Sequence, residues 1–146
     1  MNNSKLSPAD MVVLAAGVVM LIGSFLSFYT ISLFGHSLSS NAWSSGLFGI
    51  ATVVVLCGVV MATQVAVSTF ANGVTFPDSF LGLTWDQIHL ALGFQATIMM
   101  LAFLIQDHGP FSLGVGFWLM LISGIALLVG AIMRVTGTGS TPNTTG

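Results

Sequence analysis

The stretch from Leu83 to Ile105, LTWDQIHLALGFQATIMMLAFLI, decides how this chain folds. A helix needs about 20 mostly apolar residues to cross ~30 Å of hydrocarbon, and this stretch supplies them. Thr84 and Gln87 have the spacing of a capping box, so the helix is expected to begin at Trp85 or Asp86. The stretch therefore predicts a transmembrane helix that carries a few polar side chains at defined depths.

Three further apolar runs flank this one. With it they give four expected spans, at about 11–29, 43–69, 86–105 and 113–135. The predicted fold is an all-α integral membrane protein, a four-transmembrane-helix bundle forming one domain over residues 1–135. Residues 136–146, which are Gly, Thr, Ser, Pro and Asn, are expected to form a disordered tail.

Composition supports a membrane protein and excludes several functions. Hydrophobic residues make up 55% of the 146 residues and charged residues only 4%, against about 25% charged in a typical soluble domain. No basic cluster offers a surface for nucleic acid. The expected partners are therefore membrane lipids and other membrane protein subunits.

The connection between the first two spans, residues 30–42, differs from the others. Apolar and polar residues alternate around a turn glycine, which is typical of two short strands. We expect either a β-hairpin lying on the membrane surface or an irregular polar loop. The alternating residues are Ile31, Leu33 and Leu38 with Ser32, Ser37 and Ser39, around Phe34-Gly35.

Two patterns concern orientation and ancestry. Lys5 and Arg134 adjoin the two terminal spans, so the positive-inside rule predicts that both termini are cytoplasmic.

The sequence also suggests a tandem-duplicated helical hairpin, although apolar sequence produces such matches easily. The repeated motifs are Asp10-x-x-x-Leu14-Ala15-x-Gly17 with Asp86-x-x-x-Leu90-Ala91-x-Gly93, and Leu56-x-Gly58-x-x-Met61 with Leu128-x-Gly130-x-x-Met133.

Four polar residues are candidate intramembrane contacts: Gln64, Asp86, His89 and Gln95. Polar groups at such depths are functional candidates by default, for example in a proton or substrate relay. The competing interpretation is structural, since the helix dipole explains Asp86, while snorkelling and interhelical hydrogen bonds explain His89 and Gln64. Gln95 lies near mid-span, so it should bond to a neighbouring helix or to a partner protein.

Small residues mark a helix-packing face on the second span. Gly58, Ala62 and Ala66 recur every four residues, which lets another helix approach closely.

No cofactor, metal or catalytic site is expected. His36 and His108 fall in outer loops and His89 near the inner end of a span, so no pair suits a bis-histidine haem. A divalent ion held by His36, Asp107 and His108 is the alternative to their being solvated loop residues. No nucleophile has a base at usable spacing, and the chain is not expected to be an enzyme.

Three stretches carry a resemblance to known proteins: Leu6-Ser7-Pro8-Ala9-Asp10, the Ser-rich loop with Phe34-Gly35, and Asn41-Ala42-Trp43. Across most of its length the chain resembles the small four-span membrane proteins of unknown function common in actinobacteria. The resemblance implies a multi-pass protein of the bacterial plasma (inner) membrane, and it transfers no catalytic residue.

The sequence favours a non-catalytic accessory or scaffolding subunit of a larger membrane complex, acting through helix packing. The alternative is a small transporter or channel subunit whose oligomer gathers Gln64, His89 and Gln95 around a pathway.

Overall fold

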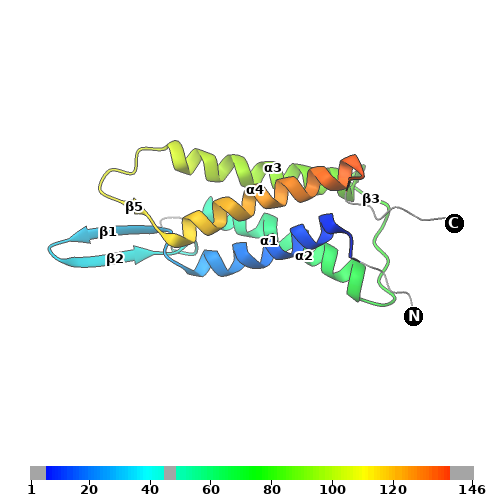
Figure 1. The fold of residues 1–146 in the computed structure, drawn as a ribbon, viewed down its shortest axis with the longest axis horizontal. Helices are drawn as coiled ribbons and strands as arrows, with labels where there is room; N and C mark the ends of the chain where they lie inside the picture. Colours follow the sequence, from blue (N-terminus) through cyan, green and yellow to red (C-terminus); the bar gives the residue numbers. More distant parts are fainter. Residues whose placement is uncertain (1–5, 45–48, 139–146) are drawn as a thin grey trace.

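A computed structural model describes residues 6–44 and 49–138 of the chain. It shows four helices, long and apolar enough to cross a membrane, that run alternately up and down in one bundle (Figure 1). Their bounds are α1 Pro8–Phe25, α2 Ala51–Phe70, α3 Trp85–Ile105 and α4 Val115–Thr136. The predicted helical bundle is present.

The helix starts follow the sequence signals for α1 and α3. The Ser7 hydroxyl accepts a hydrogen bond from the Asp10 amide, with Pro8 at the first helical position. Thr84 and Gln87 form the predicted capping box, in which each side chain accepts from the other residue's amide. These caps satisfy amides that a helix start otherwise leaves without partners.

Two span boundaries differ from the prediction. The second helix begins at Ala51 rather than near Trp43, and its N-cap residue, Ile50, makes no side-chain cap bond. The first helix ends at Phe25, because the backbone turns extended at Leu26 and then enters a strand at Tyr29. Of the tail predicted from residue 136, Thr136 closes α4, and residues 139–146 lie outside the described residues.

Helix α4 lies against both α1 and α3 and is the most buried of the four. Glycines allow its close approach. A Cβ added to Gly116 would lie 2.6 Å from the Gly23 carbonyl oxygen of α1, and one on Gly93 of α3 would lie 2.9 Å from the Leu128 Cα of α4. The helix backbones are therefore almost in contact at both interfaces.

The small-residue face of α2 packs on α1. A Cβ on Gly17 would lie 2.5 Å from the Ala62 Cβ, and one on Gly58 would lie 2.7 Å from the Met20 sulfur. Ala66 is half-buried one turn further along the same helix.

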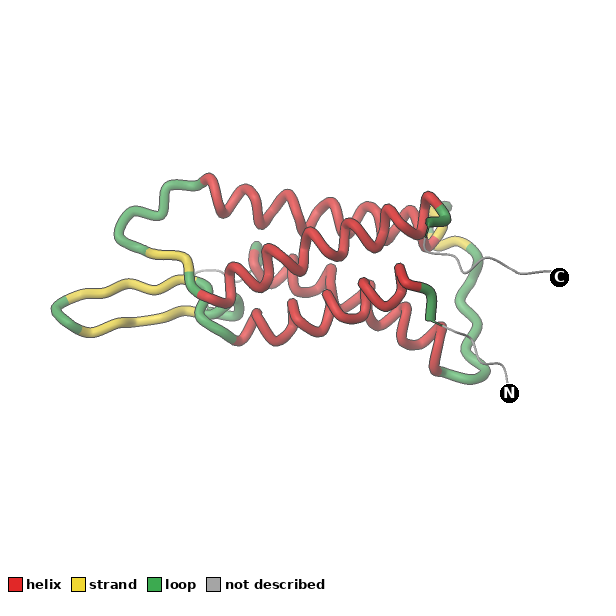
Figure 2. Tube along the Cα trace, in the orientation of Figure 1, coloured by secondary structure: helices red, strands yellow, loops and turns green. Residues whose placement is uncertain are grey.

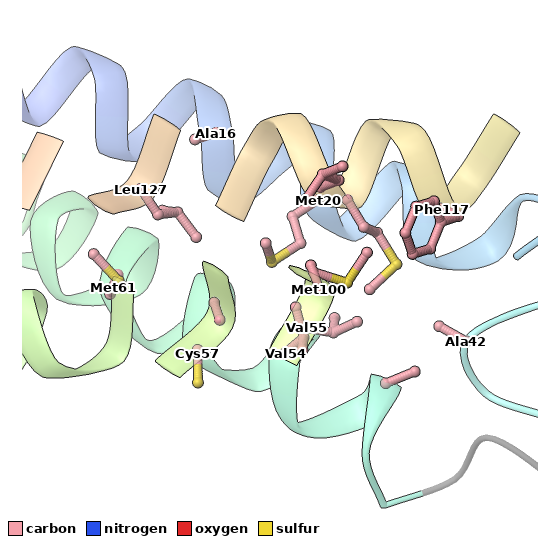
Figure 3. Packing of buried hydrophobic residues seen from close by; sticks show 14 of the residues in the cluster. Ala16, Met20, Ala42, Val54, Val55, Cys57, Met61, Met100, Phe117 and Leu127 are labelled. Atoms are coloured by element: carbon pink, nitrogen blue, oxygen red, sulfur yellow. The ribbon is translucent and has the colours of Figure 1, made fainter. Parts of the chain in front are cut away.

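The space between the helices is filled by apolar side chains, many of them methionines. Met20, Met61, Met100 and Leu127 are fully buried at its centre, and Phe117 closes the outer end (Figure 3). Flexible methionine side chains suit this position, because they fill irregular gaps between helices well.

The predicted hairpin between the first two helices is present. Strands β1 (Tyr29–Leu33) and β2 (His36–Ser40) pair antiparallel, with Ile31 opposite Leu38, and β5 (Ser112–Leu113) pairs with the base of β1. The hairpin continues the long axis of the bundle rather than lying across its end (Figure 2). Its placement on a membrane surface stays a prediction. A second, two-residue hairpin, β3 (Ser79–Phe80) and β4 (Leu83–Thr84), precedes α3 at the opposite end of the bundle.

Replacing Gly116 by Ala should destabilise the bundle by about 1–2 kcal/mol, because backbone oxygens of α1 must shift to admit the methyl group. Gly124→Ala is the matched control, since its Cβ would meet nothing closer than 3.7 Å and gains helix propensity. Thermal unfolding in mild detergent measures both variants. Equal midpoints for the two variants would contradict the close approach of α1 and α4.

Candidate functional sites at the two ends of the bundle

The hairpin of β1 and β2 is called the outer hairpin, and the end of the bundle where α1 ends and α4 begins is called its outer end. An aromatic cluster anchors this hairpin at its base. Phe28 is fully buried, and its ring centroid lies 5.2 Å from that of Phe103 in α3 and 5.3 Å from that of Phe117 in α4, both edge to face. The Trp43 indole donates a hydrogen bond of 2.9 Å to the Ser24 hydroxyl and stacks on Phe25. The residues on both sides of the hairpin are thus fixed to the helices.

Backbone hydrogen bonds complete this anchor. The Phe28 amide donates to the Ser40 carbonyl at 2.7 Å, and the Gly114 amide donates to the Phe28 carbonyl at 2.8 Å. Partial burial raises the pKa of the Tyr29 phenol, which lies beside the rings of His108 and Phe111, so it stays neutral at physiological pH. Contacts within the chain therefore hold the base of the hairpin against the helices.

The tip of the hairpin is apolar and has no support from the bundle. Phe34 is fully exposed, and Leu33 and Leu38 beside it are 49% and 65% exposed. Phe34 (φ 50°) and Gly35 (φ 80°) both adopt left-handed conformations, as in the tight hairpin turns that favour Asn-Gly or Asp-Gly. An aromatic residue there costs conformational energy and gains no contact in the monomer, which marks it as a functional candidate.

The hairpin of β3 and β4, at the opposite end of the bundle and called the inner hairpin, has the same turn in a different setting. Leu81 (φ 54°) and Gly82 (φ 79°) form its tip, and Leu81 is 88% exposed. Beside it, Trp85 contacts the Phe76 and Phe80 rings and donates a hydrogen bond to the Pro77 carbonyl. Such an aromatic group at a helix start is typical of a membrane interface.

An ion-pair cluster joins three helices at the inner end. Arg134 of α4 donates from Nη1 to the Asp10 carboxylate of α1 at 2.9 Å and from Nε to the Asp86 carboxylate of α3 at 3.0 Å. Asp10 and Asp86 hold equivalent positions in the suggested repeat. The close contacts of Gly17 and Gly93 fall at different places along their partner helices, so the duplication stays a prediction.

Two of the predicted polar residues lie inside the bundle. His89 is 1% exposed and Gln64 7% exposed. Neither ring nitrogen of His89, nor the side-chain oxygen of Gln64, has a hydrogen-bond partner among the described residues. Buried polar groups without partners are costly, so this level of the bundle is a candidate for bound water or a small polar ligand.

The fourth predicted residue lies elsewhere. Gln95 is exposed on α3, near the middle of the span, and makes no hydrogen bond within the described part of the chain. Gln64 and His89 face inward and Gln95 faces outward, so the three side chains do not line one surface.

The outer-loop histidines do not form a metal site. The His108 Nε2 lies 2.6 Å from the Phe103 carbonyl oxygen, and the Asp107 carboxylate accepts from the Gly109 amide. His36 lies at the tip of the hairpin, in β2. Within residues 6–44 and 49–138, no three His, Cys, Asp or Glu side chains are grouped to hold a metal ion.

Sequence reasoning missed the ion pairs of Arg134 and the full exposure of Phe34. Arg134 served only as an orientation signal, although Asp10 and Asp86 stood at equivalent helix starts as possible carboxylate partners. Phe34 was noted only as part of a turn. The available signal was an aromatic residue where Asn or Asp normally precedes the turn glycine.

Family models, curated proteins and solved structures were all compared with the chain, and none of them matches it.

Removing the charge of Arg134 should loosen the inner end. Arg134→Met leaves two carboxylates without their cation and should cost about 1–2 kcal/mol, between the values for exposed and buried pairs. Asp10→Asn should destabilise more than Asp86→Asn, since the Asp10 side chain is 24% exposed and that of Asp86 48%. Thermal unfolding of the three variants in detergent measures this order, and an unchanged Arg134→Met midpoint would rule out a structural role for the cluster.

Proposed function

We propose that this chain is a non-catalytic accessory or scaffolding subunit of a larger membrane protein complex. It resides in the bacterial plasma membrane with both termini in the cytoplasm, so the long hairpin stands on the non-cytoplasmic side. Its action is contact: it binds another membrane subunit beyond the lipid surface and holds it in place.

The observation that carries this proposal is the tip of the outer hairpin. The hairpin has two strands of five residues each, which place Phe34 about 17 Å beyond its anchored base. The Phe34 ring is fully exposed on an otherwise Ser-rich hairpin, and its backbone conformation disfavours an aromatic residue. Aromatic side chains placed in this way are the usual anchors of protein interfaces.

The apolar filling of the bundle also supports contact rather than conduction. Met20, Met61 and Met100 are fully buried between the helices. A pathway through one bundle would have to displace these side chains.

Phe34→Asn tests the proposal without disturbing the fold, because Asn suits the left-handed turn better than Phe. We expect the thermal midpoint to be kept or raised, and the amount of the partner subunit that co-purifies from native membranes to fall about tenfold or more. Quantitative mass spectrometry of the purified particle measures the loss.

Leu81→Asn is the matched control. It makes a similar change, from an apolar side chain to Asn, in the same turn geometry at the opposite end of the bundle, and should leave the co-purifying subunits unchanged. Equal co-purification with Phe34→Asn and the parent chain would count against the hairpin tip as the binding site.

A second candidate function, passage of protons or a small solute, is favoured by the unpartnered His89 and Gln64. Flux into vesicles containing the purified parent chain and the His89→Leu variant tests it. We expect no flux above empty vesicles in either case. A parent flux that His89→Leu abolishes would replace the accessory role by transport.

A further inference from the structure

The exposed side of α3 carries a seam that fits a second helix. It follows the alternating four- and three-residue spacing of a helix-helix contact, and all of its members are exposed. Helix α3 is also the least buried of the four. The α3 seam consists of Ala91, Gln95, Ile98, Ala102 and Ile105.

Gln95 at the centre of this seam needs a partner that its own bundle does not supply. It is the eleventh residue of a helix of 21 and therefore lies in the hydrocarbon if α3 spans a membrane. An amide there without a hydrogen bond costs several kcal/mol. The hydroxyl of Thr97, also in α3, has hydrogen-bond partners inside the bundle, the Gly93 and Gly124 carbonyls. The Gln95 side chain makes no such bond within the described chain.

We infer that the α3 seam binds the α3 seam of a second copy of this chain. Lys5 and Arg134 give every copy the same topology by the positive-inside rule, so two facing α3 helices are parallel and their Gln95 side chains lie at one depth. An amide both donates and accepts, so a two-fold axis along the membrane normal lets each Gln95 satisfy the other. A different partner would need its own polar group at that depth.

The neighbours of Gln95 allow the approach. Ala91 and Ala102 place small side chains on the seam, one turn before and two turns after Gln95. An apolar groove between α3 and α4 runs beside the seam and gives side chains of the second copy a recess. Its walls are Gln87, Leu90, Ala91, Phe94, Leu128 and Ile132. A single polar pair in an apolar seam also fixes the register of the two helices.

Cross-linking in membranes tests this dimer. In a Cys57→Ala background, Ile98→Cys should form a disulfide-linked dimer on mild oxidation. Val18→Cys should not, although Val18 is similarly exposed on α1, at 54% against 47% for Ile98. Equal cross-linking of both variants would mean random collision and overturn the proposal.

A second measurement tests the role of the amide. Gln95→Leu should weaken self-association of the purified chain in lipid vesicles about tenfold, measured by energy transfer between labelled copies over a range of dilutions. Phe34→Asn should leave this association unchanged, which separates the dimer from partner binding at the hairpin. A monomeric parent chain, or undiminished association of Gln95→Leu, would overturn the assignment.

Discussion

The structure depends on the close approach of α4 to α1 and α3 at glycines. Lipid chains are as apolar as the side chains that face them, so helices in a membrane associate through packing rather than through the hydrophobic effect. The Gly116 contact joins the start of α4 to the end of α1. Beside it, the Gly114 amide donates a hydrogen bond to the Phe28 carbonyl of the segment that follows α1. The same contact therefore positions β5 against the base of the outer hairpin, and this pairing sets the direction in which the hairpin projects.

The two ends of the bundle are stabilised by different interactions. At the inner end one cation, Arg134, holds the carboxylates of two other helices. At the outer end the rings of Phe28, Phe103 and Phe117 and the adjoining backbone bonds hold the sheet. Apolar side chains, many of them methionines, fill the space between the two ends. This division leaves the hairpin tips and the outward-facing helix surfaces exposed, which agrees with a role based on contact.

Much of the fold could be predicted because its signals are local. Uncharged runs of span length gave the four helices, the Thr84–Gln87 spacing gave the start of α3, and alternation around Phe34-Gly35 gave the hairpin. The start of α2 was missed because residues 43–69 contain no charged residue that would mark a boundary. Gly49, whose φ is 104°, shows that the chain there is not yet helical.

The candidate sites were less predictable, because they depend on which way each side chain faces. Helix α3 is apolar on all sides, so its sequence could not say that His89 faces the core and Gln95 the lipid. The partners of Arg134 lie 124 and 48 residues away, beyond any local pattern. Only the packing of α4 between α1 and α3 brings these groups together.

The most direct test of the central claim is the mass and composition of the native particle extracted in mild detergent. An accessory subunit should appear in stoichiometric amounts with at least one other membrane protein, in a particle heavier than a dimer of this 15.2 kDa chain. A particle that contains only copies of this chain would contradict the account.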